Sequence, residues 1–124
     1  MLDKNHEIHN ISIEKDQDVN LGINFKDALF DSIKQCNNRC PFCFIDQQPS
    51  GKRKSLYVKD DDYRLSFLYG SYLTLTNLRK EDWERISMQK LSPLFISVHA
   101  TDPITREKLL KNKNAGIILD QITW

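Results

Sequence analysis

The sequence predicts an α/β fold in which strands alternate with helices. Residues 71–77, "SYLTLTN", alternate polar and apolar side chains as a strand does, and residues 79–90 have the spacing of an amphipathic helix. A second strand pattern, "PLFISVHA", follows at 93–100. This order indicates βα units with a parallel sheet, which right-handed crossovers curl into a barrel or an open doubly wound sheet. We expect about three such units, at 29–69, 71–90 and 93–124.

The first 26 residues predict a short β-hairpin. Residues 8–13 and 23–25 favour strands, and the polar segment 14–22 between them favours a turn. An isolated two-stranded hairpin is only marginally stable in water. We therefore divide the chain into the hairpin at 1–26 and the βα units at 27–124.

The first βα unit contains a long loop. Residues 29–35 predict a strand that runs directly into the cysteines, and the loop that follows carries proline, glycine and the basic run 52–54. Residues 60–70 then predict a short helix. Asp60 or Asp61 is the expected N-cap, and Gly70 is the expected stop signal.

The last helical segment has clear boundary signals. Asp102 is a suitable N-cap, and Pro103 stands at the first helical position, where its missing N–H has no helical partner. The stretch "KNKNAG", residues 111–116, predicts an interruption before "IILDQITW" resumes. The pattern therefore indicates a helix that begins at 102–103 and is broken near residue 111.

Length, composition and charge exclude several classes of protein. The 124 residues suit one domain, with 40% hydrophobic and 28% charged residues and a net charge of +1. This charge gives no strong signal for nucleic acid or for an anionic membrane. The apolar runs are too short to span a bilayer, and the polar N-terminus does not resemble a signal peptide. We expect a cytoplasmic protein whose thiols stay reduced.

All three cysteines, Cys36, Cys40 and Cys43, form a C-x3-C-x2-C pattern. An odd number in a reducing compartment argues against a disulfide. A structural zinc site needs four ligands, so a zinc-stabilised module would have to recruit His99 or Asp46. Three thiolates suit an iron–sulfur cluster in which one iron lacks a protein ligand. The pattern therefore favours a metal centre with an open position for a small molecule.

The stretch "CNNRCPFC", with Phe42 before the last cysteine, resembles the signature of the radical S-adenosylmethionine (radical SAM) superfamily. The resemblance implies a 4Fe–4S cluster on Cys36, Cys40 and Cys43, with S-adenosylmethionine on the fourth iron. It further implies reductive cleavage of that cofactor to a 5′-deoxyadenosyl radical. An electron donor such as flavodoxin or ferredoxin would be a partner, and the substrate is unknown. The implied fold is a partial (βα) barrel of radical SAM type.

A longer resemblance runs from about residue 27 to the C-terminus. It includes "CNNRCPFCFIDQQPSGKRKSLYVKDDDYRLSFLYGSYLTLTNL" and "LSPLFISVHATDP". These stretches resemble an uncharacterised subgroup of iron–sulfur oxidoreductases with an N-terminal PDZ-like domain and a C-terminal domain of unknown function. On this basis residues 1–26 end the PDZ-like domain or form a linker, and residues 27–124 form the N-terminal half of the barrel. The chain then looks like a fragment, so an inactive product remains an alternative to an enzyme.

The polar faces of the two strands supply the remaining candidate site residues. In a βα barrel, functional side chains lie at the C-terminal ends of the strands. Thr76 and Asn77 end the first strand, where many members of the superfamily carry a Gly-Gly-Glu-like motif that contacts the amino group of the cofactor. Ser97 and His99 share the polar face of the second strand. We predict that Phe42, Thr76, Asn77, Ser97 and His99 bind the cofactor, although β-propensity and a buried core histidine would also explain the pattern.

Overall fold

The structure, a computed structural model, describes residues 7–24, 28–29 and 31–124. The chain divides into two units, Met1–Ser32 and Ile33–Trp124, and each is considered by itself. In the described part of the chain, no helix is both long enough and apolar enough to cross a membrane.

The described residues of the first unit do not form the predicted hairpin. Ile8 makes an isolated bridge, but no longer strand occurs in residues 7–24, and Phe25 lies outside the described residues. The polar turn is present, because the backbone N–H of Val19 donates to the carbonyl of Asp16 over 3.1 Å. Ile8, at 74% exposure, and Val19, at 53%, stay in solvent. Without apolar burial, nothing offsets the entropy of ordering two strands.

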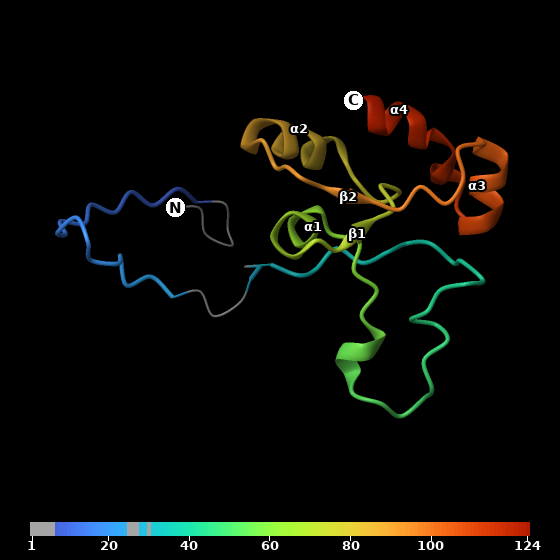
Figure 1. Ribbon diagram of the computed structural model, residues 1–124, viewed down its shortest axis with the longest axis horizontal. Helices are drawn as coiled ribbons and strands as arrows, with labels where there is room; N and C mark the ends of the chain where they lie inside the picture. The colour runs from blue at the N-terminus through green and yellow to red at the C-terminus, as the bar shows by residue number, and fades with distance from the viewer. Residues whose placement is uncertain (1–6, 25–27, 30) are drawn as a thin grey trace. The chain divides into compact units, whose positions relative to one another are not determined.

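The second unit alternates helices and strands around a two-stranded parallel sheet (Figure 1). The strands pair in register, with Tyr72 opposite Phe95 and Leu73 opposite Ile96. The parallel pairing confirms a mixed α/β architecture built from strand–helix–strand connections. The elements in chain order are the 3-10 helix η1 (Lys54–Tyr57), α1 (Tyr63–Tyr69), β1 (Tyr72–Leu73), α2 (Lys80–Gln89), β2 (Phe95–Ile96), α3 (Pro103–Leu110), the 3-10 helix η2 (Lys113–Ile117) and α4 (Ile118–Thr123).

The strand expected at 29–35 is absent from the described residues of that segment, which exclude Phe30. Gln35 instead makes an isolated antiparallel bridge with Asp60. A side chain from a distant part of the chain holds this segment in place, because the carboxylate of Asp62 accepts the backbone N–H of Lys34 over 2.8 Å. With this strand missing, the described sheet has two strands, and two strands do not establish the predicted partial barrel.

Local signals place the helix ends well, with one shift. The N-cap of α1 is Asp62, not Asp60 or Asp61, and its side chain accepts the backbone N–H of Arg64. Gly70 ends α1 in the left-handed conformation, at φ 76°. Asp102 caps α3 by accepting the N–H of Thr105 over 2.8 Å, as its position before a proline predicts. The predicted interruption is also present, as η2 separates α3 from α4.

The hydrophobic core lies between the helices and the apolar face of the strands. Leu73 and Leu75 are buried, at 0% and 2% exposure, which confirms the face predicted for them. Leu94, Ile96 and Val98 are partly buried and pack against the same cluster. Each fully buried leucine or isoleucine contributes roughly 1.5–3 kcal/mol. The fully or largely buried members come from four elements and their ends: Tyr63, Leu73, Leu75, Ile86 and Ile118.

Candidate functional site

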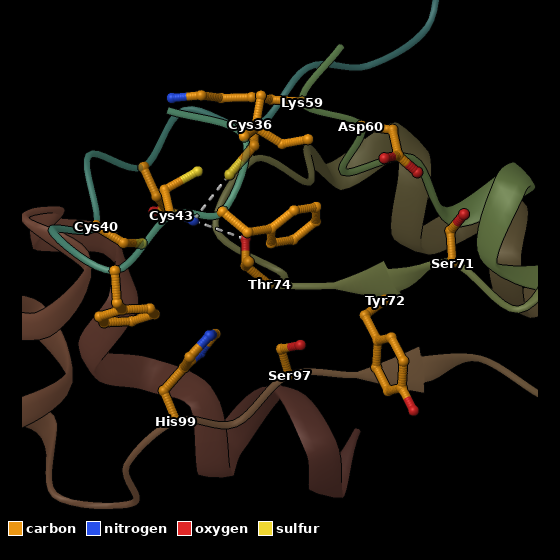
Figure 2. Close-up of a pocket in the computed structure, with 14 residues that line it drawn as sticks. Cys36, Cys40, Cys43, Lys59, Asp60, Ser71, Tyr72, Thr74, Ser97 and His99 are labelled. Carbon is orange, nitrogen blue, oxygen red and sulfur yellow. Dashed lines mark hydrogen bonds between the residues drawn. The ribbon is translucent and has the colours of Figure 1, made fainter. Parts of the chain in front are cut away.

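The three cysteines line one pocket of about 360 Å³ in the second unit (Figure 2). The cysteine loop, residues 36–49, forms one side of this pocket. The opposite side, here called the strand wall, consists of Thr74, Ser97 and His99. The cysteine loop also contributes Asn38, Phe42, Phe44 and Ile45, and the segments next to the two walls contribute Lys59, Asp60, Ser71 and Tyr72.

Backbone hydrogen bonds shape the cysteine loop. The N–H of Cys36 donates to the carbonyl of Lys59 over 2.8 Å, and the N–H of Cys43 donates to the carbonyl of Cys40 over 3.1 Å. The N–H of Arg39 reaches the carbonyl of Leu110 over 2.9 Å. The first and last of these bonds attach the loop to distant parts of the chain, while the middle one closes a turn that brings two cysteines together.

The electrostatics of the thiols suit a positively charged centre. Burial raises the pKa of the Cys36 thiol, and the charges of Asp61 and Cys43 raise it further. Burial, followed by the charges of Cys36 and Cys43, also raises the pKa of Cys40. All three cysteines are free and partly buried. The thiols therefore repel one another as thiolates, and a metal centre would relieve that repulsion.

The chemistry of these donors fits an iron–sulfur cluster, since soft thiolates select such clusters or zinc. The side chains are not arranged as a finished metal site. Among the described residues, no group of three histidine, cysteine, aspartate or glutamate side chains is placed to hold a metal ion. The cysteine loop thus presents three thiols to one pocket without arranging them as a metal site.

A buried polar network lies behind the cysteine loop. The Nδ2 group of Asn38 donates to the sulfur of Cys36 over 3.3 Å and to Oγ1 of Thr74 over 2.9 Å. The hydroxyl of Thr74 in turn donates to the carboxylate of Asp61 over 2.5 Å, and the backbone N–H of Thr74 donates to the same carboxylate over 2.6 Å. This network connects the first cysteine to Asp61 and to Thr74, the residue that follows β1.

Two residues in or next to the strand wall have an unusual backbone conformation. Leu75 and His99 both adopt the left-handed conformation, at φ 62° and φ 65°. Non-glycine residues rarely occupy this region, and such positions cluster at functional sites. Around His99 the chain turns sharply, since the N–H of Ala100 donates to the carbonyl of Val98 over 2.8 Å. The turn follows β2 and brings the imidazole to the pocket.

The rings of Phe42 and His99, which both line the pocket, lie close together, with their centroids 5.6 Å apart and their planes tilted by 40°. Burial lowers the pKa of His99, and the nearby cation of Arg106 lowers it further. His99 is therefore neutral at pH 7, with one ring nitrogen free to accept a hydrogen bond.

Arg106 holds the ends of both strands in place. Its side chain is fully buried, and its guanidinium donates to the carbonyls of Val98 over 2.7 Å and Ser97 over 3.2 Å. It also donates to the carbonyl of Thr74 over 2.8 Å and to that of Ala115 over 2.6 Å. A single side chain from α3 thus joins the residues after β1, the residues after β2 and η2.

The structure brings most of the predicted site residues together. Phe42, Ser97 and His99 line the same pocket as the three cysteines. Thr76 lies behind the pocket, where its hydroxyl donates to Asn37 over 2.8 Å.

Asn77 does not line the pocket either. Its Nδ2 group donates to the backbone carbonyls of Gln35 and Asp61, each over 3.0 Å. Neither Thr76 nor Asn77 lines the pocket, so their contacts with a cofactor stay a prediction.

Sequence reasoning missed several residues that shape the site. Arg106 and Asn38 are buried, yet nothing in the sequence around them distinguishes them from surface residues. Asp61 was expected only as a possible helix cap, and its partner Thr74 was only one polar position of the alternating segment 71–77. The acidic run 60–62 was the one available signal, and it indicated a helix cap with solvated charges, because aspartate is mostly exposed in proteins.

The fold and the site together describe an α/β domain that presents three free cysteines in one pocket. Comparison with protein families identifies the class: the chain matches the radical SAM-like domain over residues 15–124. The chain therefore belongs to the radical SAM-like domain family. Comparisons with curated proteins and with solved structures gave no match.

Proposed function

We propose that this chain is a cluster-binding radical SAM enzyme domain, in which Cys36, Cys40 and Cys43 hold a 4Fe–4S cluster. The observation that supports this proposal most strongly is that all three thiols line one pocket, in a chain of the radical SAM-like family. Three cysteine ligands leave one iron of such a cluster without a protein ligand. S-adenosylmethionine is the cofactor proposed for that position.

The bound cluster and cofactor would together supply reductive cleavage of S-adenosylmethionine to a 5′-deoxyadenosyl radical. The residues of the chain bind and shield these groups. Phe42 and His99 present two rings that limit water on the side of the cysteines, and Ser97 offers a hydroxyl. The pocket volume lies within the roughly 300–1,000 Å³ that small-molecule sites occupy. Neutral His99 can accept a hydrogen bond from a polar ligand.

The proposal includes a partner that delivers one electron at a time, such as flavodoxin or ferredoxin. Lys59 gives the pocket a cation near Cys36 and Cys43, and it is paired with the carboxylate of Asp46 over 2.5 Å. An acidic electron carrier would be attracted by Lys59 and by the basic run 52–54, which is exposed.

Anaerobic reconstitution with iron and sulfide tests the proposal. The wild-type chain should take up about four irons and show broad visible absorbance. Cys40→Ala should lose most of both, because it removes one of three ligands. Gln47→Ala is the matched control, since Gln47 is exposed in the same loop, outside the pocket.

Other results would replace the proposal. A colourless protein that binds zinc and no iron would indicate a non-catalytic, zinc-stabilised module. Its fourth ligand would have to be His99, which faces the pocket, or Asp46, which would have to leave Lys59. A wild-type chain that binds no metal would indicate an inactive product.

A further inference from the structure

The side chain of Asn38 is directed at the sulfur of Cys36 by every polar partner it has. Asn38 is 5% exposed. Its Oδ1 atom accepts from Nδ2 of Asn112 over 2.7 Å, and Oγ1 of Thr76, whose one proton has a shorter bond to Asn37, lies 3.1 Å away. Because the amide of Asn112 can only donate through Nδ2, the atom of Asn38 that it meets is the oxygen, and the Nδ2 group of Asn38 occupies the other position. That position faces Cys36.

The second hydrogen-bond partner of the Nδ2 group fixes the same orientation. Nδ2 lies 2.9 Å from Oγ1 of Thr74 and 3.3 Å from the sulfur of Cys36. The hydroxyl proton of Thr74 is directed to the carboxylate of Asp61 over 2.5 Å, so its oxygen is free to accept from Asn38. A chain of hydrogen bonds therefore runs from Asp61 through Thr74 and Asn38 to the sulfur.

We propose that Asn38 is a positioning residue that orients the Cys36 sulfur and raises the reduction potential of the cluster; this inference rests on the proposed function. Hydrogen bonds to cluster sulfurs tune the potential, because they stabilise the negative charge that reduction adds. The side-chain Nδ2 group of Asn38 supplies such a bond from a buried site, where water does not compete.

Asn37 provides a matched control within the same loop. It is the same type of residue, and its Oδ1 also accepts from Asn112 and Thr76, over 2.9 Å and 2.8 Å. Its Nδ2 donates to the backbone carbonyl of Thr76 over 3.4 Å, and not to a cysteine of the loop. Asn37 is also exposed. A variant of Asn37 therefore disturbs the network without removing the bond to sulfur.

The experiment measures the midpoint potential of the reconstituted cluster by reductive titration with a chemical reductant under anaerobic conditions. Asn38→Ala should shift the potential to a more negative value than that of the wild type. Asn38→Asp keeps the shape of the side chain but replaces the donor with an anion, so it should shift the potential further in the same direction. Asn37→Ala should leave the potential unchanged, and Asn37→Asp should shift it less than Asn38→Asp does.

The outcomes separate this inference from the proposed function. If the wild type takes up no cluster, the proposed function fails and this inference fails with it. If the wild type takes up a cluster and Asn38→Ala has the wild-type potential, only this inference is overturned. Failure of both Asn38 variants to hold a cluster, with normal loading of Asn37→Ala, would also overturn it, in favour of a role in folding the loop alone.

Discussion

The two walls of the pocket are built in different ways. The strand wall is attached to the hydrophobic core through Leu73 and Leu75, and Arg106 ties its ends together with four hydrogen bonds to backbone carbonyls. The cysteine loop has no helix or strand between residues 36 and 49. It is attached at a few points, chiefly the backbone bonds of Cys36 and Arg39 and the side chain of Asn38.

This difference indicates that the two walls have different roles in the pocket. The strand wall is preformed, so it can present Ser97 and His99 in fixed positions to a ligand. The cysteine loop carries the thiols but does not gather them into a finished metal site in the described structure. Binding free energy of a cluster would therefore order the loop, because ligand binding and local folding are linked.

The largest effect should come from breaking the strand wall at Arg106. Arg106→Met removes hydrogen bonds to four carbonyls and leaves them buried. We expect a loss of about 3 kcal/mol or more in the free energy of unfolding, since each unsatisfied buried polar group costs about 1–3 kcal/mol. Denaturant unfolding followed by circular dichroism measures it.

Arg85→Met is the control for this substitution. Its guanidinium reaches the hydroxyl of Tyr63 over 3.4 Å. It should change stability by less than about 1 kcal/mol. Equal losses in the two variants would contradict the role assigned to Arg106.

A smaller, pH-dependent effect should come from Asp61, which supports Thr74 of the strand wall. Burial raises the pKa of Asp61 above 3.8, although hydrogen bonds from Thr74 partly oppose the shift. A raised pKa means that the folded state binds the proton more tightly than the unfolded state does. The contribution of Asp61 to stability is therefore complete below pH 3.8 and is lost as the pH rises through the folded-state pKa.

Asp61→Asn should remove this component of the pH dependence. Unfolding curves collected from pH 3 upward measure it, and Asp102→Asn is the control. The hydrogen bonds from Thr105 lower the pKa of Asp102, so its contribution has the opposite sign and is lost as the pH falls. Parallel pH profiles for wild type and Asp61→Asn would show that the carboxylate does not titrate with folding.

The smallest effect should come from the ion pair at the edge of the cysteine loop. Lys59 and Asp46 lie 2.5 Å apart, but the side chain of Asp46 is 53% exposed. Because water screens exposed pairs, Lys59→Met should change the free energy of unfolding by no more than about 1 kcal/mol. Thermal unfolding at low and high salt measures the change. A loss as large as that of Arg106→Met would show that the loop is as firmly built as the strand wall.

Local rules predicted a good part of the fold. The alternation in 71–77 correctly placed Leu73 and Leu75 in the core, and the Asp102–Pro103 pair marked the start of α3. The sequence overestimated the strands, because β1 and β2 are two residues each and the segment at 29–35 has none in its described residues. Strand pairing depends on distant partners, which a local pattern does not contain.

The candidate site was predicted less completely than the fold. The cysteine spacing and the polar face of 93–100 indicated residues that share one pocket. The first was recognised from thiolate chemistry and the resemblance to a family signature, and the second from strand alternation. Arg106 and Asn38 could not be predicted, because their partners lie far away in the sequence. The left-handed backbone at Leu75 has no signal either, because leucine rarely adopts that conformation, and the enrichment of histidine there is too small to mark His99.

We propose that three cysteines hold a cluster and leave one iron for S-adenosylmethionine. Electron paramagnetic resonance of the reduced, reconstituted chain checks this proposal, with spectra recorded before and after S-adenosylmethionine is added. We expect a cluster signal whose g values change when the cofactor is added, because the cofactor binds the open iron. An unchanged signal at saturating S-adenosylmethionine would contradict it and leave a cluster that only transfers electrons.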